Sequence, residues 1–431
     1  MSQENADQAL AEAGDAGGLP APVAHVYPLG SRVNAAGNLE IGGCDTVEVA
    51  REFGTPAYVY AEDDMRERAR AVTAAFARRT ERFQVVYASK AFPATAALRL
   101  FAEEGLSCDV ASGGELHMAL TGGFLADRIF MHGNNKSDRE LEEALAAGVG
   151  HIVVDSFDEI DRLERLARDR SQRVLLRVPP GIETETHAKI RTGQADSKFG
   201  IPMAQVRQAM DRCAQAGLDL RGLHAHIGSQ VFALDVYEQL ADVLLQIGDL
   251  PLLNLGGGFG IAYTREDRPP AADEYAEAML RAAPDDVSVL CEPGRSLVGN
   301  AGVSLYTVGT VKEIPGVRTY VSVDGGMSDN IRPMLYGAVY EADLASRFGD
   351  STPCRIAGMH CESGDVLVPE AALEDPRPGD ILVIPATGAY GHAMANNYNA
   401  VRRPPVIFCR DGDARAVVRR ETYDDLTRRD V

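Results

Sequence analysis

Residues suited to bond-making chemistry in this sequence follow short apolar runs. They are Lys90, Asp109, His226 with Ser229, the glycine run 256–258, and Glu292 with Arg295. A lysine beside small residues at a strand end is partly desolvated, which favours the neutral amine that forms a Schiff base with an aldehyde. A solvated surface charge is the simpler interpretation of Lys90 taken alone.

The run LGGGFG contains Gly256, Gly257 and Gly258 directly after a predicted strand. Backbone N–H groups without side chains can close around a phosphate, so the run predicts a phosphate cradle, with a tight turn as the alternative. The run is not a dinucleotide fingerprint, because Ile261 occupies the place of the last glycine.

The segment CEPGR sets Glu292 and Arg295 after the last apolar run. A carboxylate facing a pyridine nitrogen keeps it protonated, and the cationic ring then accepts electrons when a bond to an α-carbon breaks. The guanidinium of Arg295 could hold a phosphate or a carboxylate. A structural ion pair is the other interpretation, but the combination with Lys90 favours pyridoxal 5′-phosphate (PLP) as cofactor.

Two histidines, His224 and His226, lie two positions apart on one predicted strand and therefore share a face. Either could be a packed core histidine. We expect His226 against the cofactor ring, because it precedes the turn that carries Ser229. No third metal ligand accompanies the pair in sequence, so we predict no metal site.

Eight apolar runs alternate with amphipathic helical segments. Continuous apolar strands joined by helices indicate a parallel sheet, and eight such units suit a closed (β/α)₈ TIM-like barrel whose active site lies at the carboxyl ends of the strands. A doubly wound open sheet is the alternative. The runs are 83–88, 106–110, 128–131, 151–154, 174–178, 222–225, 252–255 and 287–290.

Outside the barrel, which we place at residues 57–305, the sequence predicts three further parts. Residues 306–431 form short β-rich pieces broken by Gly, Pro and Asp, which indicates a C-terminal, mostly antiparallel β domain. The fold class is thus α/β plus all-β. Residues 29–56 are expected to join the β domain, with strands at 39–41 and 47–49, and residues 1–28 to form a mobile tail.

Composition excludes several classes of partner. The 431 residues include 63 acidic and 43 basic side chains, a net charge of −20 that argues against nucleic acid and anionic membranes as partners. Seven cysteines without a CxxC pair indicate reduced thiols. No apolar stretch reaches the length of about 18 residues that a membrane helix needs, so we expect a soluble cytoplasmic protein.

With these pieces in place, the chain resembles the diaminopimelate decarboxylases, a branch of the alanine-racemase-like (fold type III) PLP-dependent decarboxylases. The resemblance runs from about residue 53 to 426. Its motifs are YASKAF, HGNNKS, TGQADSKFG, HAHIGSQ, GGGFG, CEPGR, VDGGMSDNIRPMLY, HCESGD, TGAYG and NNYN. The departures from the family pattern are Pro93, Gly391-His392 and Asn396.

The resemblance implies a role for each site residue. Lys90 would carry PLP, with Asp109, His226 and Glu292 around its ring. Ser229, Gly256 to Gly258, Arg295 and Tyr390 would hold its phosphate. Arg295, Arg332, Tyr336 and Tyr390 would grip substrate, and Glu362 would read its distal amino group. Cys361 would be the acid that reprotonates the α-carbon.

The resemblance also implies the reaction and the assembly. The substrate would be meso-diaminopimelate, an amino acid, and the products L-lysine and carbon dioxide, in the last step of lysine biosynthesis. Subunits would pair as a homodimer in which Cys361 and Glu362 complete the partner's active site. The alternatives are a related decarboxylase of ornithine, arginine or a carboxylated polyamine, or a PLP-binding regulatory protein without catalysis. Arg332 and Tyr336 argue against the former, and the joint presence of Lys90, Glu292 and Cys361 against the latter.

Overall fold

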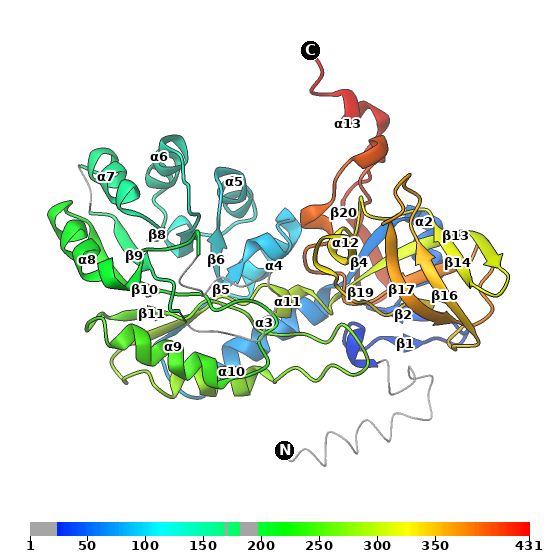
Figure 1. Ribbon diagram of the computed structural model, residues 1–431, viewed down its shortest axis with the longest axis horizontal. Helices are drawn as coiled ribbons and strands as arrows, with labels where there is room; N and C mark the ends of the chain where they lie inside the picture. Colours follow the sequence, from blue (N-terminus) through cyan, green and yellow to red (C-terminus); the bar gives the residue numbers. More distant parts are fainter. Residues whose placement is uncertain (1–23, 169–170, 182–196) are drawn as a thin grey trace. The chain divides into compact units, whose positions relative to one another are not determined.

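The computed structural model describes residues 24–168, 171–181 and 197–431 (Figure 1). Most of the predicted tail, residues 1–23, lies outside the described residues. The chain forms two compact units, described separately below. Unit 1 comprises residues 1–65, 262–268 and 298–431, and unit 2 comprises residues 66–261 and 269–297.

Unit 2 is a closed barrel of eight parallel strands (Figure 1). The barrel closes because β12 pairs with β5 and β9 pairs with β10, each in parallel. The predicted (β/α)₈ barrel is therefore confirmed, and the open-sheet alternative is excluded. The strands are β5 (Phe83–Ala88), β6 (Ser107–Val110), β7 (Ile129–Met131), β8 (His151–Val154), β9 (Arg173–Arg177), β10 (Asp219–His224), β11 (Leu252–Asn254) and β12 (Ser288–Cys291).

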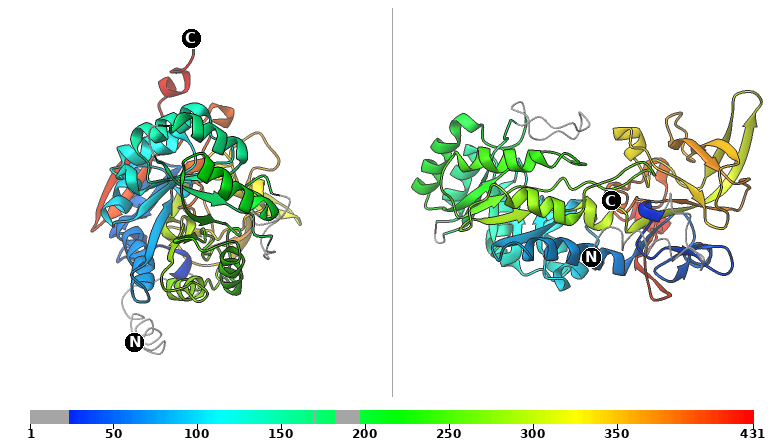
Figure 2. Two further views of the ribbon diagram at one scale, coloured as in Figure 1. Left: turned by 90° about the vertical axis from the view of Figure 1, so that its left-hand side faces the viewer. Right: turned by 90° about the horizontal axis from the view of Figure 1, so that it is seen from below.

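Helices surround these strands, as the left-hand view of Figure 2 shows. Three of them begin at a serine whose hydroxyl accepts a hydrogen bond from the N–H of a glutamate three residues later, which satisfies one of the free donors of the first turn. The pairs are Ser112 with Glu115, Ser137 with Glu140, and Ser156 with Glu159. The helices of unit 2 include α4 (Thr95–Glu103), α5 (Gly113–Thr121), α6 (Asp138–Ala147), α7 (Phe157–Leu166), α8 (Val206–Gln215), α9 (Asp235–Leu245) and α10 (Ala272–Leu280), while α3 (Glu62–Ala77) and α11 (Arg295–Val298) run across a unit boundary.

Unit 1 contains a nine-stranded sheet with both parallel and antiparallel pairs. Its main path runs β17-β16-β14-β13-β4-β19-β20, and β18 joins β13 and β15 beside it. The predicted C-terminal β domain is thus confirmed as a fold class. The strands are β4 (Ala57–Ala61), β13 (Gly302–Ile314), β14 (Arg318–Val323), β15 (Asp343–Leu344), β16 (Thr352–Ala357), β17 (Val366–Leu373), β18 (Ile381–Ile384), β19 (Val406–Arg410) and β20 (Asp413–Val418).

The N-terminal part of unit 1 differs from the sequence prediction in two places. Residues 47–49, predicted as a strand, lie in helix α2 (Thr46–Phe53), because the Asp45 carboxylate accepts hydrogen bonds from the N–H groups of Val47 and Glu48 and so caps a helix. Strand β4, where we placed the start of the barrel, pairs with β13 and β19 of unit 1. All five of its residues are buried, a pattern that does not reveal which sheet a strand joins.

The remaining elements of this part form a small sheet of their own. Strands β1 (Arg32–Val33), β2 (Leu39–Ile41) and β3 (Cys44–Asp45) are antiparallel neighbours. Leu39 and Ile41 are buried in one apolar core with β13, β18 and β19. This burial explains the apolar pattern that the sequence shows at 39–41.

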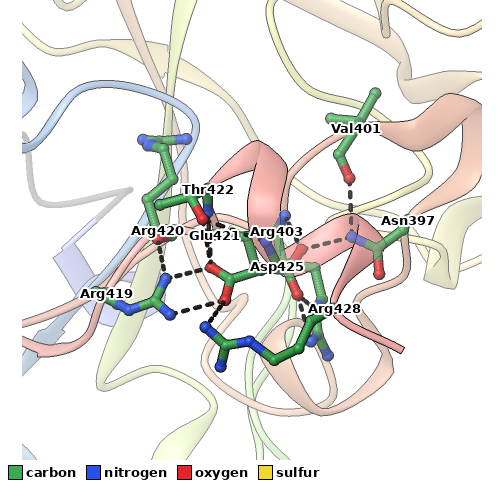
Figure 3. Close-up of polar contacts among 9 residues, drawn as sticks. All are labelled: Asn397, Val401, Arg403, Arg419, Arg420, Glu421, Thr422, Asp425 and Arg428. Carbon is green, nitrogen blue, oxygen red and sulfur yellow. Dashed lines mark hydrogen bonds and ion pairs between the residues drawn. The ribbon is translucent and has the colours of Figure 1, made fainter. Parts of the chain in front are cut away.

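Near the C-terminus, two carboxylates hold the chain through charged contacts (Figure 3). Asp425, at the third position of α13 (Tyr423–Thr427), pairs with Arg419 and Arg428. Glu421 pairs with Arg403 and accepts a hydrogen bond from Asn397. The Glu421 contacts hold the segment that contains the NNYN motif.

None of the helices that the structure describes combines the length and the hydropathy needed to span a lipid bilayer.

The centre of the barrel generates a prediction about stability. Leu175 is fully buried among Val86, Phe130, Val153 and Leu290. Leu175→Ala leaves a cavity there and should lower the free energy of unfolding by about 2–5 kcal/mol, measured by urea denaturation. Leu125 is 67% exposed, so Leu125→Ala should change stability by less than about 0.5 kcal/mol. Equal losses in the two variants would contradict the assigned core.

Candidate active site

The buried carboxylate of Glu292 is the centre of a polar cluster at the carboxyl ends of the barrel strands. Its Oε1 accepts a hydrogen bond from Asn254 Nδ2 at 2.6 Å and lies 3.0 Å from His132 Nε2. Its Oε2 lies 3.2 Å from His224 Nε2. The strands that end here place all four residues together, since His132 follows β7, His224 and Asn254 end β10 and β11, and Glu292 follows β12.

Charge balance keeps Glu292 ionised. Burial acts to raise the pKa of Glu292, but the nearby His132 and His224 outweigh burial and hold the pKa well below its usual range. Burial is likewise opposed at His132, where Asp109 and Glu292 raise the pKa. Burial lowers the pKa of His224 to about 4, so at neutral pH this ring is uncharged and supports Glu292 as a hydrogen-bond donor.

Asp109 and Lys90 belong to the neighbouring strands. Asp109 on β6 is buried, and its Oδ1 lies 3.9 Å from His132 Nε2; burial raises the pKa of this carboxyl. Lys90 lies in the short 3₁₀ turn Ser89–Ala91 directly after β5. The charge of Lys90 shifts the pKa values of Asp109 and His226, so its side chain is within electrostatic reach of both.

The glycine run after β11 is fixed by close backbone packing. A Cβ on Gly257 would lie 2.1 Å from the carbonyl oxygen of Glu292, and Gly256 and Gly258 have positive φ angles of 67° and 102°. The N–H of Gly256 donates to Asn254 Oδ1 at 3.0 Å, and that of Gly257 to His226 Nδ1 at 3.2 Å. Two of the three N–H groups predicted to face a phosphate therefore orient Asn254 and His226 instead.

Ser229 and Arg295 form the cationic side of the site. The Ser229 hydroxyl accepts hydrogen bonds from Arg295 Nε at 3.2 Å and Nη2 at 2.9 Å. Arg295 is 7% exposed and begins α11, three residues after Glu292. A buried guanidinium beside a hydroxyl is a donor set suited to phosphate or carboxylate.

Five of the predicted site residues lie in unit 1: Arg332, Tyr336, Tyr390, Cys361 and Glu362. Arg332, at the start of α12 (Arg332–Tyr336), is buried and donates to the hydroxyls of Tyr263, at 2.8 Å, and Tyr340. Its guanidinium carbon lies 5.8 Å from the ring centre of Tyr390, a cation–π contact. Tyr336, the last residue of α12, is partly buried.

Cys361 and Glu362 are exposed on the loop before β17 in this single chain. Glu362 accepts a hydrogen bond from the hydroxyl of Tyr398 in the NNYN motif. Two departures from the family pattern lie nearby in the sequence. The ring of His392 packs edge-on against that of Tyr58 with ring centres 5.9 Å apart, and Asn396 Oδ1 accepts a hydrogen bond from the N–H of Tyr398.

Sequence reasoning missed His132, Asn254 and Arg177, and left His224 as a possible core residue. The first residue after β7 is His132, and the last residue of β9 is Arg177, so the same rule applied to every strand would have found both. His132, His224 and Glu292 also bring three potential metal-ligand atoms within 4.8 Å of one another, a grouping that the spacing of the histidines did not reveal.

These residues fit PLP as a group. An ionised, buried carboxylate suits the protonated pyridine nitrogen, the Arg295 and Ser229 pair suits the phosphate, and Lys90 at the end of β5 suits the aldehyde. A family model described as "Pyridoxal-dependent decarboxylase, pyridoxal binding domain" matches residues 62–299. The barrel and its site are thus those of a PLP-dependent decarboxylase.

Relatives specify the branch. The diaminopimelate decarboxylase of Bacillus subtilis is 48% identical, over 93% of this chain and 97% of the relative, and that of a Synechocystis species is 43% identical, over 95% and 94%. The crystal structure of the diaminopimelate decarboxylase "from m. jannaschii in co-complex with L-lysine" has a TM-score of 0.87 at 33% identity, covering 93% of this chain and 97% of that one. The chain belongs to the diaminopimelate decarboxylase family. The predicted family, enzyme class and cofactor are confirmed, whereas the roles of single residues stay predictions.

The charge balance around Glu292 predicts a pH effect. The pKa of Glu292 is lower in the folded state than in the unfolded state. The ionised carboxylate therefore stabilises the folded site at pH values above the unfolded pKa, and this stabilisation is lost as pH falls through the folded pKa. His132→Asn removes one of the groups that lower the pKa of Glu292, so PLP should be lost on acidification at a pH higher by about 1 unit or more, followed by visible absorbance. His117→Asn on the exposed side of α5 is the matched control. An unchanged midpoint in His132→Asn would refute this pairing.

Proposed function

We propose that the chain catalyses the decarboxylation of meso-diaminopimelate to L-lysine and carbon dioxide, the last step of lysine biosynthesis. The observation that carries the proposal is the ionised Glu292 carboxylate, buried in a barrel whose relatives are diaminopimelate decarboxylases. When bound, PLP supplies a protonated ring that accepts the electron pair left by the departing carboxylate. We also propose that the protein is cytoplasmic, as its sequence predicts.

Residues of unit 2 would bind and tune the cofactor. Lys90 would bind it covalently through the ε-amine. Glu292 keeps a proton on the ring nitrogen, and His226, oriented by the Gly257 N–H, supports the ring face. Arg295, Ser229 and the Gly256 to Gly258 loop would hold the phosphate. Because the N–H groups of Gly256 and Gly257 already donate to Asn254 and His226, Arg295 would neutralise most of the phosphate charge.

Residues of unit 1 would select the substrate. Arg332, with Tyr336 and Tyr390, binds a carboxylate, and its hydrogen bonds to Tyr263 and Tyr340 pre-orient the guanidinium. Glu362 reads the distal ammonium group. Cys361 donates the proton that replaces the lost carboxylate on the α-carbon.

A homodimer with shared active sites is part of the proposal. Cys361 and Glu362 are exposed in the single chain, as expected for side chains that act in a partner's site. Without a partner, an exposed thiol and carboxylate would have no water-excluded surroundings in which to select substrate or transfer a proton.

Substrate turnover tests the reaction directly. Purified protein with PLP should release carbon dioxide from meso-diaminopimelate and not from lysine or ornithine. Lys90→Ala should abolish both the release and the visible absorbance of bound PLP, whereas Lys312→Ala on β13, an exposed lysine, should preserve them. Release from ornithine alone would replace the proposed substrate, and an unchanged spectrum in Lys90→Ala would remove that residue from its role.

Subunit mixing tests the shared site. Lys90→Ala and Glu362→Ala each disable a different part of the site, and Glu362→Ala should lower kcat/KM for diaminopimelate by about 10- to 100-fold. Mixing the two variants should restore about a quarter of wild-type activity, because half of the random dimers hold one intact site. Glu370→Ala, an exposed glutamate of β17, should behave as wild type. Mixtures with no gain in activity would argue that each chain builds its own site.

A further inference from the structure

The ammonium group of Lys136, in the HGNNKS motif, is buried inside the barrel unit. Lys136 is 2% exposed and its partner Glu159 1% exposed. Its Nζ donates to three acceptors: Gly133 O at 2.7 Å, Val153 O at 2.8 Å and Glu159 Oε1 at 2.6 Å. An ammonium has three N–H groups, so this charge is fully hydrogen-bonded, as a buried charge must be.

One side of this contact leads to His132. The bond to Gly133 O closes the loop after β7 on itself, and Gly133, with φ of 120°, directly follows His132. A Cβ on Gly133 would lie 3.3 Å from Ala111 O, so the loop also packs closely against the end of β6. The backbone that carries His132 is therefore fixed where His132 Nε2 lies 3.0 Å from Glu292.

The other side leads to Arg177. Glu159 Oε2 accepts a hydrogen bond from the Asp155 N–H at 3.1 Å, and Asp155 Oδ1 accepts one from the Gly200 N–H at 2.7 Å. Asp155 Oδ2 lies 3.9 Å from Arg177 Nε, and the Arg177 guanidinium carbon lies 4.2 Å from the ring centre of Phe199. Arg177 is thus held between a carboxylate and an aromatic ring.

Both ends of the network act on the same group. Burial lowers the pKa of Arg177, but the negative charges of Asp155, Glu292 and Asp109 act to raise it. His132 Nε2 lies 3.0 Å from Glu292 Oε1 and 3.9 Å from Asp109 Oδ1. The imidazole of His132, after β7, and the guanidinium of Arg177, at the end of β9, therefore both interact electrostatically with Glu292 and Asp109. The Lys136–Glu159 pair is linked to both side chains, to His132 through Gly133 and to Arg177 through Asp155.

We propose that the buried Lys136–Glu159 pair is a positioning device that sets His132 and Arg177 around the Glu292 carboxylate and thereby determines how tightly PLP binds. The inference rests on the proposed function. It assigns a task to Lys136 in HGNNKS and to the Phe199–Gly200 end of TGQADSKFG, which the predicted roles of the site residues leave without one. A pair that served stability alone would change the melting temperature and leave PLP affinity untouched.

Paired replacement separates these two roles. Lys136→Met with Glu159→Met removes both charges at similar volume, which avoids leaving one charge buried alone. We expect the dissociation constant of PLP, measured by titrating apoprotein and following visible absorbance, to rise about 10- to 100-fold, because small displacements of supporting groups are costly. Glu159→Gln keeps an acceptor for Lys136 and should give a smaller rise. It also decides the question if the double variant does not fold.

An exposed ion pair supplies the control. Arg139 and Glu143 on α6 lie four residues apart, with 86% and 42% of their side chains exposed, so Arg139→Met with Glu143→Met should leave PLP affinity unchanged. Wild-type affinity and spectrum in Glu159→Gln and in the folded double variant would overturn the positioning role and leave the proposed function intact. A wild-type protein that binds no PLP would overturn the proposed function and this inference with it.

Discussion

An ionised carboxylate inside a barrel is stable only if its surroundings replace the water it has lost. Glu292 meets this condition with three groups: an amide donor from Asn254, a neutral imidazole from His224, and the imidazole of His132, whose pKa is raised by Asp109 and Glu292. Each comes from a different strand end, so the carboxylate stays ionised only while the barrel holds these ends together. Cofactor chemistry at this site depends on that constraint.

The same constraint explains why the backbone around Glu292 is tightly packed. Gly257 packs so closely on the Glu292 carbonyl that a side chain has no room there, and its N–H orients His226. The loop predicted as a phosphate cradle therefore also orients the side chains of Asn254 and His226. The Lys136–Glu159 pair plays a comparable part on the opposite strands, where a second buried charge is satisfied completely.

Much of this arrangement could be predicted from local patterns. The eight barrel strands follow from apolar runs spaced by helical segments, and Lys90, Asp109, His226 and Glu292 follow from their positions at strand ends. Partners distant in sequence could not be predicted. The pairing of β4 with β13, the helix at 46–53 and the Lys136–Glu159 contact depend on three-dimensional neighbours that hydrophobic periodicity does not encode.

Glu292 should contact the ring nitrogen of bound PLP, and a crystal structure of the protein with PLP bound would test this contact most directly. We expect continuous density from the Lys90 side chain to the cofactor and a Glu292 oxygen within about 3.2 Å of the ring nitrogen. A ring nitrogen facing another group, with Glu292 held only by His132, His224 and Asn254, would contradict it.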